Sequence, residues 1–254
     1  MAELDLSGRR ALVTGGGSGI GAAIARRLGA AGADVVVADI DAGRAAAVAT
    51  ECGGRPWVVD LADTAALAAA DAGVVPDVDV LVNNAGIQHV ARLEEFPPER
   101  FAFMLRLMLE APFLLIRAVL PSMYRRGWGR IVNISSAHGL RASAYKSAYV
   151  TAKHGLEGLS KVTALEGAAH GVTSNCVNPG YVRTPLVEAQ IADQARVHEL
   201  PEERVVSEVL LANEAIKRLI EPGEVAEAVA HLCGPAAQST TGTNLVIDGG
   251  WSAR

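Results

Sequence analysis

Short, continuous apolar segments alternate with longer Ala-rich segments along nearly the whole chain, and this alternation is what most restricts its fold. Seven apolar segments predict strands, at residues 10–14, 34–39, 57–60, 78–83, 130–135, 173–178 and 244–248. Six Ala-rich segments predict helices, at residues 21–31, 43–51, 64–72, 99–125, 149–170 and 224–233. Uninterrupted apolar strands are typical of a parallel sheet covered on both faces. Strands that alternate with helices imply right-handed crossovers, so we predict an α/β fold with a doubly wound parallel sheet.

One segment departs from this alternation. Residues 185–220, between the sixth strand and the last helix, have a mostly helical pattern rich in Glu, Gln and Arg. Ligands bind beyond the carboxyl ends of the strands in such sheets, so we predict that this segment is a lid over the substrate. A pair of additional surface helices is the alternative. A chain of 254 residues fits one or two domains, and because the motifs below run through one sheet we predict a single domain over residues 1–254.

Composition and charge argue against several classes of protein. The net charge is −5 and no block of Lys and Arg occurs, which argues against a nucleic-acid partner. The three cysteines are far apart and have no metal-ligand spacing, so we expect neither a disulfide framework nor a metal site. The most apolar stretch, residues 101–120, contains Arg106, Glu110 and Arg117, which argues against a membrane span. No signal segment is visible, and we expect a cytoplasmic protein.

A glycine-rich turn connects the first strand to the first helix. It reads Thr14-Gly15-Gly16-Gly17-Ser18-Gly19-Ile20-Gly21. Glycines let the backbone approach a pyrophosphate closely, and the helix N-terminus offers free N–H groups to the anion. We therefore predict a dinucleotide site. The predicted phosphate-binding residues are Gly15, Gly17, Ser18, Gly19, Ile20 and Gly21. A merely tight turn is the alternative.

Two acidic residues that end strands bear on the choice of dinucleotide. Asp39 ends the second strand, where a carboxylate accepts hydrogen bonds from the adenosine ribose hydroxyls and repels a 2′-phosphate. We therefore predict NAD rather than NADP, with an N-cap for the next helix as the alternative role of Asp39. Asp60, at the end of the third strand, is assigned either to the adenine amino group or to a helix cap, with Leu61 beside it at the cofactor.

Three side chains form a candidate catalytic group. Tyr149 and Lys153 are four residues apart on a predicted helix and so share one face, and Ser136 follows a buried strand. A tyrosine with its ordinary pKa of about 10 is a poor base at neutral pH. A nearby ammonium stabilises the phenolate and lowers that pKa, and a serine hydroxyl can hold a substrate oxygen in line.

Together these motifs resemble those of the short-chain dehydrogenase/reductase family over essentially the whole chain. They are the turn at residues 14–21, Asn83-Asn84-Ala85-Gly86, Ser136, Tyr149-x-x-x-Lys153 and Asn178-Pro179-Gly180. The resemblance implies a single Rossmann-type domain with a seven-stranded sheet, a homotetramer, and reversible hydride transfer between a secondary alcohol and NAD(P). It implies that Tyr149 is the acid/base, that Ser136 orients the substrate oxygen, and that Lys153 holds the nicotinamide ribose and tunes Tyr149. Asn84, Ala85 and Gly86 would lie beside the adenosine ribose, and Pro179, Gly180, Val182 and Thr184 would flank the nicotinamide.

The chain departs from the family at one position. The family usually has an Asn in the helix before the fifth strand, associated with a helix irregularity and a proton-relay water, and Met108 stands there. Pro112, four residues later, has no N–H to donate to the Met108 carbonyl. We hypothesise that this carbonyl binds the relay water instead. The alternative is that Met108 packs in the core and Pro112 only kinks the helix.

Within the family, the active-site segments resemble those of the D-3-hydroxybutyrate dehydrogenases. These segments are residues 136–140, 146–149, 161–166, 182–188 and 249–251. The resemblance implies that Gln88, His138, Lys146 and Gln190, together with Ser136 and Tyr149, bind a small hydroxy acid, with Lys146 pairing with its carboxylate. A buried carboxylate needs a cation and several donors, which agrees with this set. Tyr181 stands where that group often has Trp, and Trp251 is assigned either to the substrate pocket or to a subunit interface.

Two other functions stay open at this stage. One is reduction or oxidation of another small hydroxy acid or of a 3-ketoacyl thioester, although Lys146 and a capping lid oppose a thioester. The other is a non-catalytic protein that binds NAD, which the intact Ser136, Tyr149 and Lys153 oppose.

Overall fold

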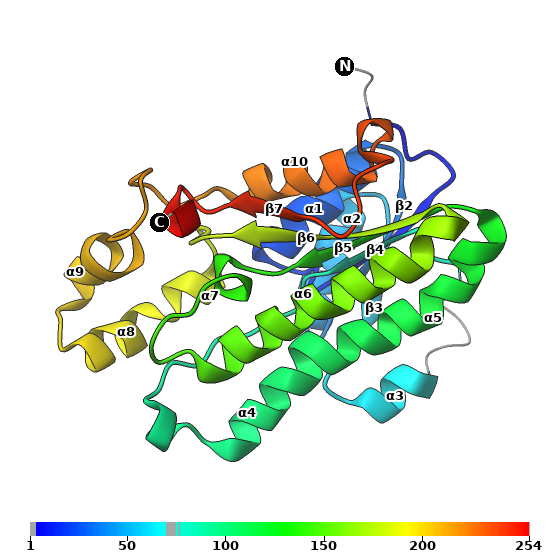
Figure 1. Ribbon diagram of the computed structural model, residues 1–254. Helices are drawn as coiled ribbons and strands as arrows, with labels where there is room; N and C mark the ends of the chain where they lie inside the picture. The colour runs from blue at the N-terminus through cyan, green and yellow to red at the C-terminus, as the bar shows by residue number, and fades with distance from the viewer. Residues whose placement is uncertain (1–3, 70–74, 76, 254) are drawn as a thin grey trace.

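Seven parallel strands form one sheet at the centre of the molecule (Figure 1). The computed structural model describes residues 4–69, 75 and 77–253. The strands are β1 (Arg10–Thr14), β2 (Asp34–Asp39), β3 (Arg55–Val58), β4 (Val80–Asn83), β5 (Gly129–Ile134), β6 (Val172–Pro179) and β7 (Asn244–Ile247). Their order across the sheet is β3-β2-β1-β4-β5-β6-β7, and every pair is parallel. The predicted doubly wound sheet is confirmed, and the strand order reverses between β1 and β4, where a crevice for ligands is expected.

Helices cover both faces of the sheet. They are α1 (Gly19–Ala30), α2 (Ala42–Glu51), α3 (Thr64–Ala69), α4 (Pro98–Leu105), α5 (Ala111–Arg126), α6 (Ser147–Gly167), α7 (Pro185–Glu188), α8 (Ile191–His198), α9 (Glu202–Val205) and α10 (Pro222–Cys233). Figure 1 shows α1 and α10 on one face and α4, α5 and α6 on the other. Neighbouring strand residues alternate between these faces: Val13 packs in the core under α1 and α10, and Leu12 in the core under α5. The last three residues of the helix predicted at 64–72 lie outside the described residues.

The single helix predicted over residues 99–125 is interrupted, and the prediction of one continuous helix is wrong. A π-helical turn at Arg106–Glu110 separates α4 from α5, and the Ala111 N–H donates to the Arg106 carbonyl across five residues. Pro112 is the second residue of α5. Because its ring nitrogen carries no hydrogen, the i to i+4 ladder cannot continue through it, and one wider turn takes up the mismatch before α5 begins.

The segment predicted as a lid forms α7, α8, α9 and a π-helical turn at Val206–Leu210. Figure 1 shows these helices beyond one end of the sheet. Val187, Val205 and Leu210 form a small core of their own within the segment. The two ends of the segment are joined: the Ile220 N–H donates to the Tyr181 carbonyl and the Arg183 N–H to the Ile220 carbonyl, both at 2.9 Å. Among the described residues, no helix has the length and hydrophobicity needed to cross a bilayer.

Candidate active site

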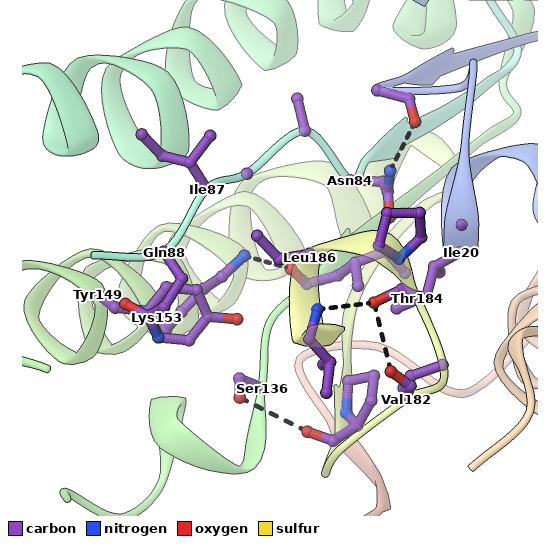
Figure 2. A pocket seen from close by; sticks show the side chains of 18 of the residues that line it. Ile20, Asn84, Ile87, Gln88, Ser136, Tyr149, Lys153, Val182, Thr184 and Leu186 are labelled. Carbon is purple, nitrogen blue, oxygen red and sulfur yellow. Dashed lines mark hydrogen bonds between the residues drawn. The ribbon is translucent and has the colours of Figure 1, made fainter. Parts of the chain in front are cut away.

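A pocket of about 440 Å³ lies at the carboxyl ends of β1, β4, β5 and β6, at the point where the strand order reverses. All of the predicted site residues line it except Gly17 and Gly21. Figure 2 shows Ile20 and Asn84 toward one end of the pocket, and Tyr149 and Lys153 toward the other. The sheet therefore brings together residues from sequence positions as distant as Gly15 and Gln190.

The glycine-rich turn has the geometry of a phosphate cradle. Gly15 and Gly19 have positive φ of 60° and 51°, and a Cβ on Gly15 would lie 2.9 Å from the Ala85 Cα. Gly21 is not in the pocket wall; a Cβ there would lie 2.1 Å from the Gly15 carbonyl oxygen, so glycine lets α1 begin against the turn. Because α1 begins at Gly19, its free N-terminal N–H groups lie at the turn, which therefore fits a dinucleotide pyrophosphate.

Asp39 is held at the pocket by backbone amides. Its carboxylate accepts hydrogen bonds from the Gly17 N–H (2.9 Å) and the Asp41 N–H (3.1 Å). Asp41, not Asp39, caps α2, since its side chain accepts from the Arg44 N–H at 3.0 Å. The alternative role of Asp39 as an N-cap is therefore wrong. Arg44, which the sequence analysis did not single out, also lines the pocket, and it pairs with Asp41 at 3.3 Å.

Asp60 and Asn84 shape the adenosine end of the pocket. The Asp60 carboxylate accepts from the Ala62 N–H at 2.9 Å, two residues before α3 begins, so it fixes a turn rather than capping that helix. The Asn84 side chain donates to the Thr14 carbonyl at 2.9 Å, and the Thr14 hydroxyl accepts from the Asn84 N–H, also at 2.9 Å. These bonds tie the end of β4 to the end of β1, and the Asn84 side chain also donates to the Gly15 carbonyl at 3.2 Å. The glycine-rich turn and residues 84–86 therefore form one wall.

Ser136, Tyr149 and Lys153 lie together at the other end, as predicted. The Lys153 ammonium donates to the Ile134 carbonyl at the end of β5 (2.7 Å) and lies 5.5 Å from the centre of the Tyr149 ring. The Ser136 hydroxyl accepts from the His138 N–H at 3.1 Å and lies 3.5 Å from the Pro179 carbonyl oxygen. Strand β5 thus ends in the carbonyl that holds the lysine, and the serine follows two residues later.

Burial acts on both members of the Tyr149–Lys153 pair. It raises the pKa of Tyr149, while the hydrogen bond with Ser136 acts in the opposite direction. Burial lowers the pKa of Lys153 to about 8. Lys153 is therefore mainly an ammonium at neutral pH, next to a phenol whose deprotonation needs a positive neighbour.

Lys146 brings a second buried ammonium to the pocket. It is 3% exposed and donates to the Tyr181 hydroxyl at 2.9 Å. Burial lowers its pKa to about 8, against the opposing charge of Glu214. The residue before it, Tyr145, has a positive φ of 70°, and this turn places Lys146 directly before α6.

The other predicted substrate ligands line the same pocket as neutral groups. Burial, followed by the charge of Lys146, lowers the pKa of His138 to about 3, and its Nε2 lies 3.0 Å from the Ser143 hydroxyl. The side-chain oxygen of Gln88 accepts from the His89 N–H at 3.0 Å, and the side-chain amide of Gln190 donates to the Leu186 carbonyl at 3.0 Å. Lys146 is thus the cationic member of the predicted set. Trp251 also lines the pocket, with its ring 5.2 Å from that of His138.

A buried carboxylate in the pocket wall, that of Glu214, was missed from the sequence. It is 3% exposed and comes from the returning arm of the 185–220 segment. The N–H groups of Ala215 and Ile216 donate to the Gly249 carbonyl at 2.8 and 2.9 Å, which fixes this arm against the turn after β7. Glu214 and Lys146 are 68 positions apart in the sequence. They come together only because this arm crosses the end of the sheet, so no local sequence pattern indicates Glu214.

Met108 packs in the core, as the alternative to the relay hypothesis states. It is 1% exposed and lies among Met104, Ala148 and Ala152. Its sulfur lies 3.3 Å from the position that a Cβ on Gly86 would take. It therefore fills the space between the 84–86 segment and the first turns of α6. The proposed water on its carbonyl stays a prediction.

A phosphate cradle, an acidic side chain at the ribose end and a Ser-Tyr-Lys group in one pocket define a dinucleotide-dependent oxidoreductase. The family model for short chain dehydrogenases matches residues 9–195. The chain therefore belongs to the short-chain dehydrogenase/reductase family.

Several relatives match nearly the whole chain. It is 44% identical to a D-beta-hydroxybutyrate dehydrogenase of Rhizobium meliloti (strain 1021), over 97% of this chain and 99% of the relative. It is 42% identical to a D-beta-hydroxybutyrate dehydrogenase of Cupriavidus necator (strain H16), over 98% of this chain and 100% of the relative. Among solved structures, an actinorhodin polyketide ketoreductase with NADPH has a TM-score of 0.91 and 34% identity, over 97% of this chain and 98% of that one.

Proposed function

We propose that this protein interconverts D-3-hydroxybutyrate and acetoacetate with NAD. The observation that carries the proposal is Lys146, an ammonium that is 3% exposed in the same pocket as Tyr149. A substrate carboxylate that enters a buried site needs a cation and several donors, and a small carboxylate at Lys146 places the rest of the molecule within the pocket that Ser136 and Tyr149 line. The names of the relatives at 44% and 42% identity support the same substrate.

The roles of the side chains follow from their positions. Ser136 holds the substrate oxygen, and Tyr149 takes the hydroxyl proton during oxidation and returns it during reduction. Lys153 stabilises the Tyr149 phenolate. The nicotinamide, when bound, accepts or returns the hydride. The lid excludes water, which strengthens the contact between Lys146 and the substrate carboxylate.

The preference for NAD rests on Asp39. Its carboxylate is fixed by the Gly17 and Asp41 amides at the ribose end of the pocket, where it would accept from ribose hydroxyls and repel a 2′-phosphate. Arg44 also lines this end, but its guanidinium is paired with Asp41. We therefore expect activity with NADP to be lower than with NAD.

A direct assay follows NADH absorbance with D-3-hydroxybutyrate, its L isomer and longer hydroxy acids, with NAD and NADP compared. We expect the D isomer with NAD to give the highest kcat/KM. A higher value for a longer acid or for NADP would replace that part of the proposal. Tight NAD binding without turnover of any of these compounds would favour a non-catalytic role.

The Lys146→Ala substitution tests the carboxylate assignment. We expect it to raise KM for D-3-hydroxybutyrate by on the order of a hundredfold, because a charge-assisted pair in a buried site is lost, with a smaller change in kcat. Lys161→Ala, an exposed lysine further along α6, is the matched control and should leave KM unchanged. An unchanged KM in Lys146→Ala would refute the assignment.

A further inference from the structure

A second buried carboxylate, that of Glu157, lies one helical turn beyond Lys153 on α6, and the proposed reaction gives it no part. Glu157 is 5% exposed and, at position i+4, shares a helix face with Lys153. Its Oε1 accepts a hydrogen bond from the Asn178 side chain at 2.5 Å. Its Oε2 is buried and, among the described residues, no N–H or O–H group donates to it; the Cys176 thiol of β6 is the side chain that interacts with this carboxylate. A carboxylate rarely occupies such a position unless its charge is used.

Glu157 is fixed from two directions. The same Asn178 amide also donates to the Ser136 carbonyl at 2.9 Å, so one side chain of β6 joins the carboxylate to the catalytic serine. The turn after Ser136 closes over it, since a Cβ on Gly139 would lie 2.8 Å from Glu157 Oε1. The carboxylate therefore cannot turn away from the site without moving β6 or this turn.

Of the titratable groups around Lys153, Glu157 is the one that supplies negative charge. Burial lowers the pKa of Lys153 to about 8, while Cys176 on β6 and Glu157 act in the opposite direction. Burial also raises the pKa of the Cys176 thiol, so Cys176 is neutral at physiological pH. On the pocket side, Tyr149 is a phenol whose pKa is raised by burial, and burial keeps His138 a neutral imidazole with a pKa of about 3.

We propose that Glu157 is a positioning residue that keeps Lys153 protonated at the pH where the enzyme works. A fixed negative charge in a poorly solvated site offsets the desolvation that would otherwise drive the proton off the lysine. Tyr149 keeps its ammonium neighbour, and with it the ability to exchange a proton with substrate. The inference rests on the proposed function only in taking Tyr149 as the acid/base, not in the identity of the substrate.

The test measures the pKa of Lys153 directly, in the full chain and without substrate. The chain has four lysines, Lys146, Lys153, Lys161 and Lys217, so ¹³C-labelled lysine gives few NMR signals, which single Lys→Met variants assign. Glu157→Gln keeps the size of the side chain and the acceptor for Asn178 but removes the charge. We expect the Lys153 titration midpoint to fall by about one pH unit, a tenfold change in its proton affinity, with the Lys146 midpoint unchanged.

Two control variants separate charge from packing. Glu157→Asp keeps the charge and displaces the acceptor from Asn178, so its Lys153 midpoint should stay near the wild-type value even if its Tm falls. Glu166→Gln makes the same change on the exposed side of α6 and should have no effect. Glu157→Met, an apolar side chain of similar size, replaces Glu157→Gln if that variant does not fold.

The kinetic consequence is a loss of turnover on the alkaline side. In Glu157→Gln the upper limb of the pH–kcat profile should move to lower pH by the same interval as the Lys153 midpoint. A Lys153 midpoint unchanged in Glu157→Gln, or equally lowered in Glu157→Asp, would overturn the proposal. Because the titration needs no substrate, an error in the proposed substrate would leave this result intact.

Discussion

Two lysines in one pocket, Lys146 and Lys153, have a pKa of about 8 for the same reason, burial, yet they face different partners. Lys153 is held by the Ile134 carbonyl and faces Tyr149. Lys146 is held by the Tyr181 hydroxyl and faces the space for substrate. The first ammonium serves the proton transfer in the proposed reaction, and the second the choice of substrate. We therefore expect the titration of each lysine to change the pH dependence of the reaction in a different way.

The effect of Lys146 appears when an acid is compared with its uncharged ester. Lys146 is an ammonium below its pKa of about 8 and a neutral amine above it, and only the ammonium pairs with a carboxylate. We expect the ratio of kcat/KM for D-3-hydroxybutyrate to kcat/KM for its methyl ester to fall as pH rises through this value, approaching about tenfold per pH unit. Titration of Lys153 and Tyr149 affects both compounds and cancels in the ratio. A ratio independent of pH would show that Lys146 does not bind the carboxylate.

At the scale of elements, the π-helical turn at Arg106–Glu110 is the main irregularity beside the site. Met108 lies in it, buried against the start of α6, and Pro112 follows it. The turn thus adjoins the helix that carries Tyr149 and Lys153. It is the place where backbone carbonyls are left without the usual helical donor, because Pro112 has no N–H.

Pro112→Ala tests whether the carbonyl of Met108 contributes to proton transfer. Alanine supplies the missing N–H, so a carbonyl that binds a relay water would instead accept a helical hydrogen bond. We expect kcat to fall about tenfold or more, with a changed proton inventory, as for other losses in a proton-transfer path. Pro121→Ala, at the other proline within α5, is the matched control. Unchanged turnover and an unchanged proton inventory in Pro112→Ala would refute the relay hypothesis.

The sequence was most informative where one local pattern determines both structure and chemistry. The glycine-rich turn requires a strand before it and a helix after it, so its place at the sheet edge follows directly. The spacing of Tyr149 and Lys153 fixes their shared face in the same way, and the same four-residue spacing places Glu157 on the face of Lys153. Glu214 and Arg44 could not be found this way, because the paths of the lid and of α2 bring them to the pocket. The π-helical turn has no signature in the apolar pattern, which is compatible with a continuous helix. Only Pro112 and the resemblance, which associates a helix irregularity with the position of Met108, point to an interruption there.

At the scale of the whole molecule, helices α5 and α6 carry three large apolar side chains that are exposed. Phe113, Val162 and Leu165 are 48%, 53% and 82% exposed. Exposed side chains of this size are candidates for an interface between subunits.

We expect a homotetramer in solution, with a mass by light scattering four times that of the chain. Leu165→Glu should weaken the assembly, because it buries a charge in the apolar contact, and shift the protein toward smaller species at micromolar concentration. Leu93→Glu changes an exposed leucine outside α5 and α6 in the same way and should not. A monomeric wild-type chain would contradict this expectation.

The two ends of the 185–220 segment are joined, and this affects which mutations the protein can tolerate. The segment leaves the body at Tyr181 and returns at Ile220, and backbone hydrogen bonds hold these two points together. These hydrogen bonds, and not the residues between Tyr181 and Ile220, set the distance between the two ends of the segment. Lengthening a loop whose ends are fixed costs little free energy. Insertions, deletions or replacements in the lid can therefore accumulate without displacing Ser136 or Tyr149. Mutations in this segment can therefore change the substrate while the groups of the proposed proton and hydride transfer keep their places.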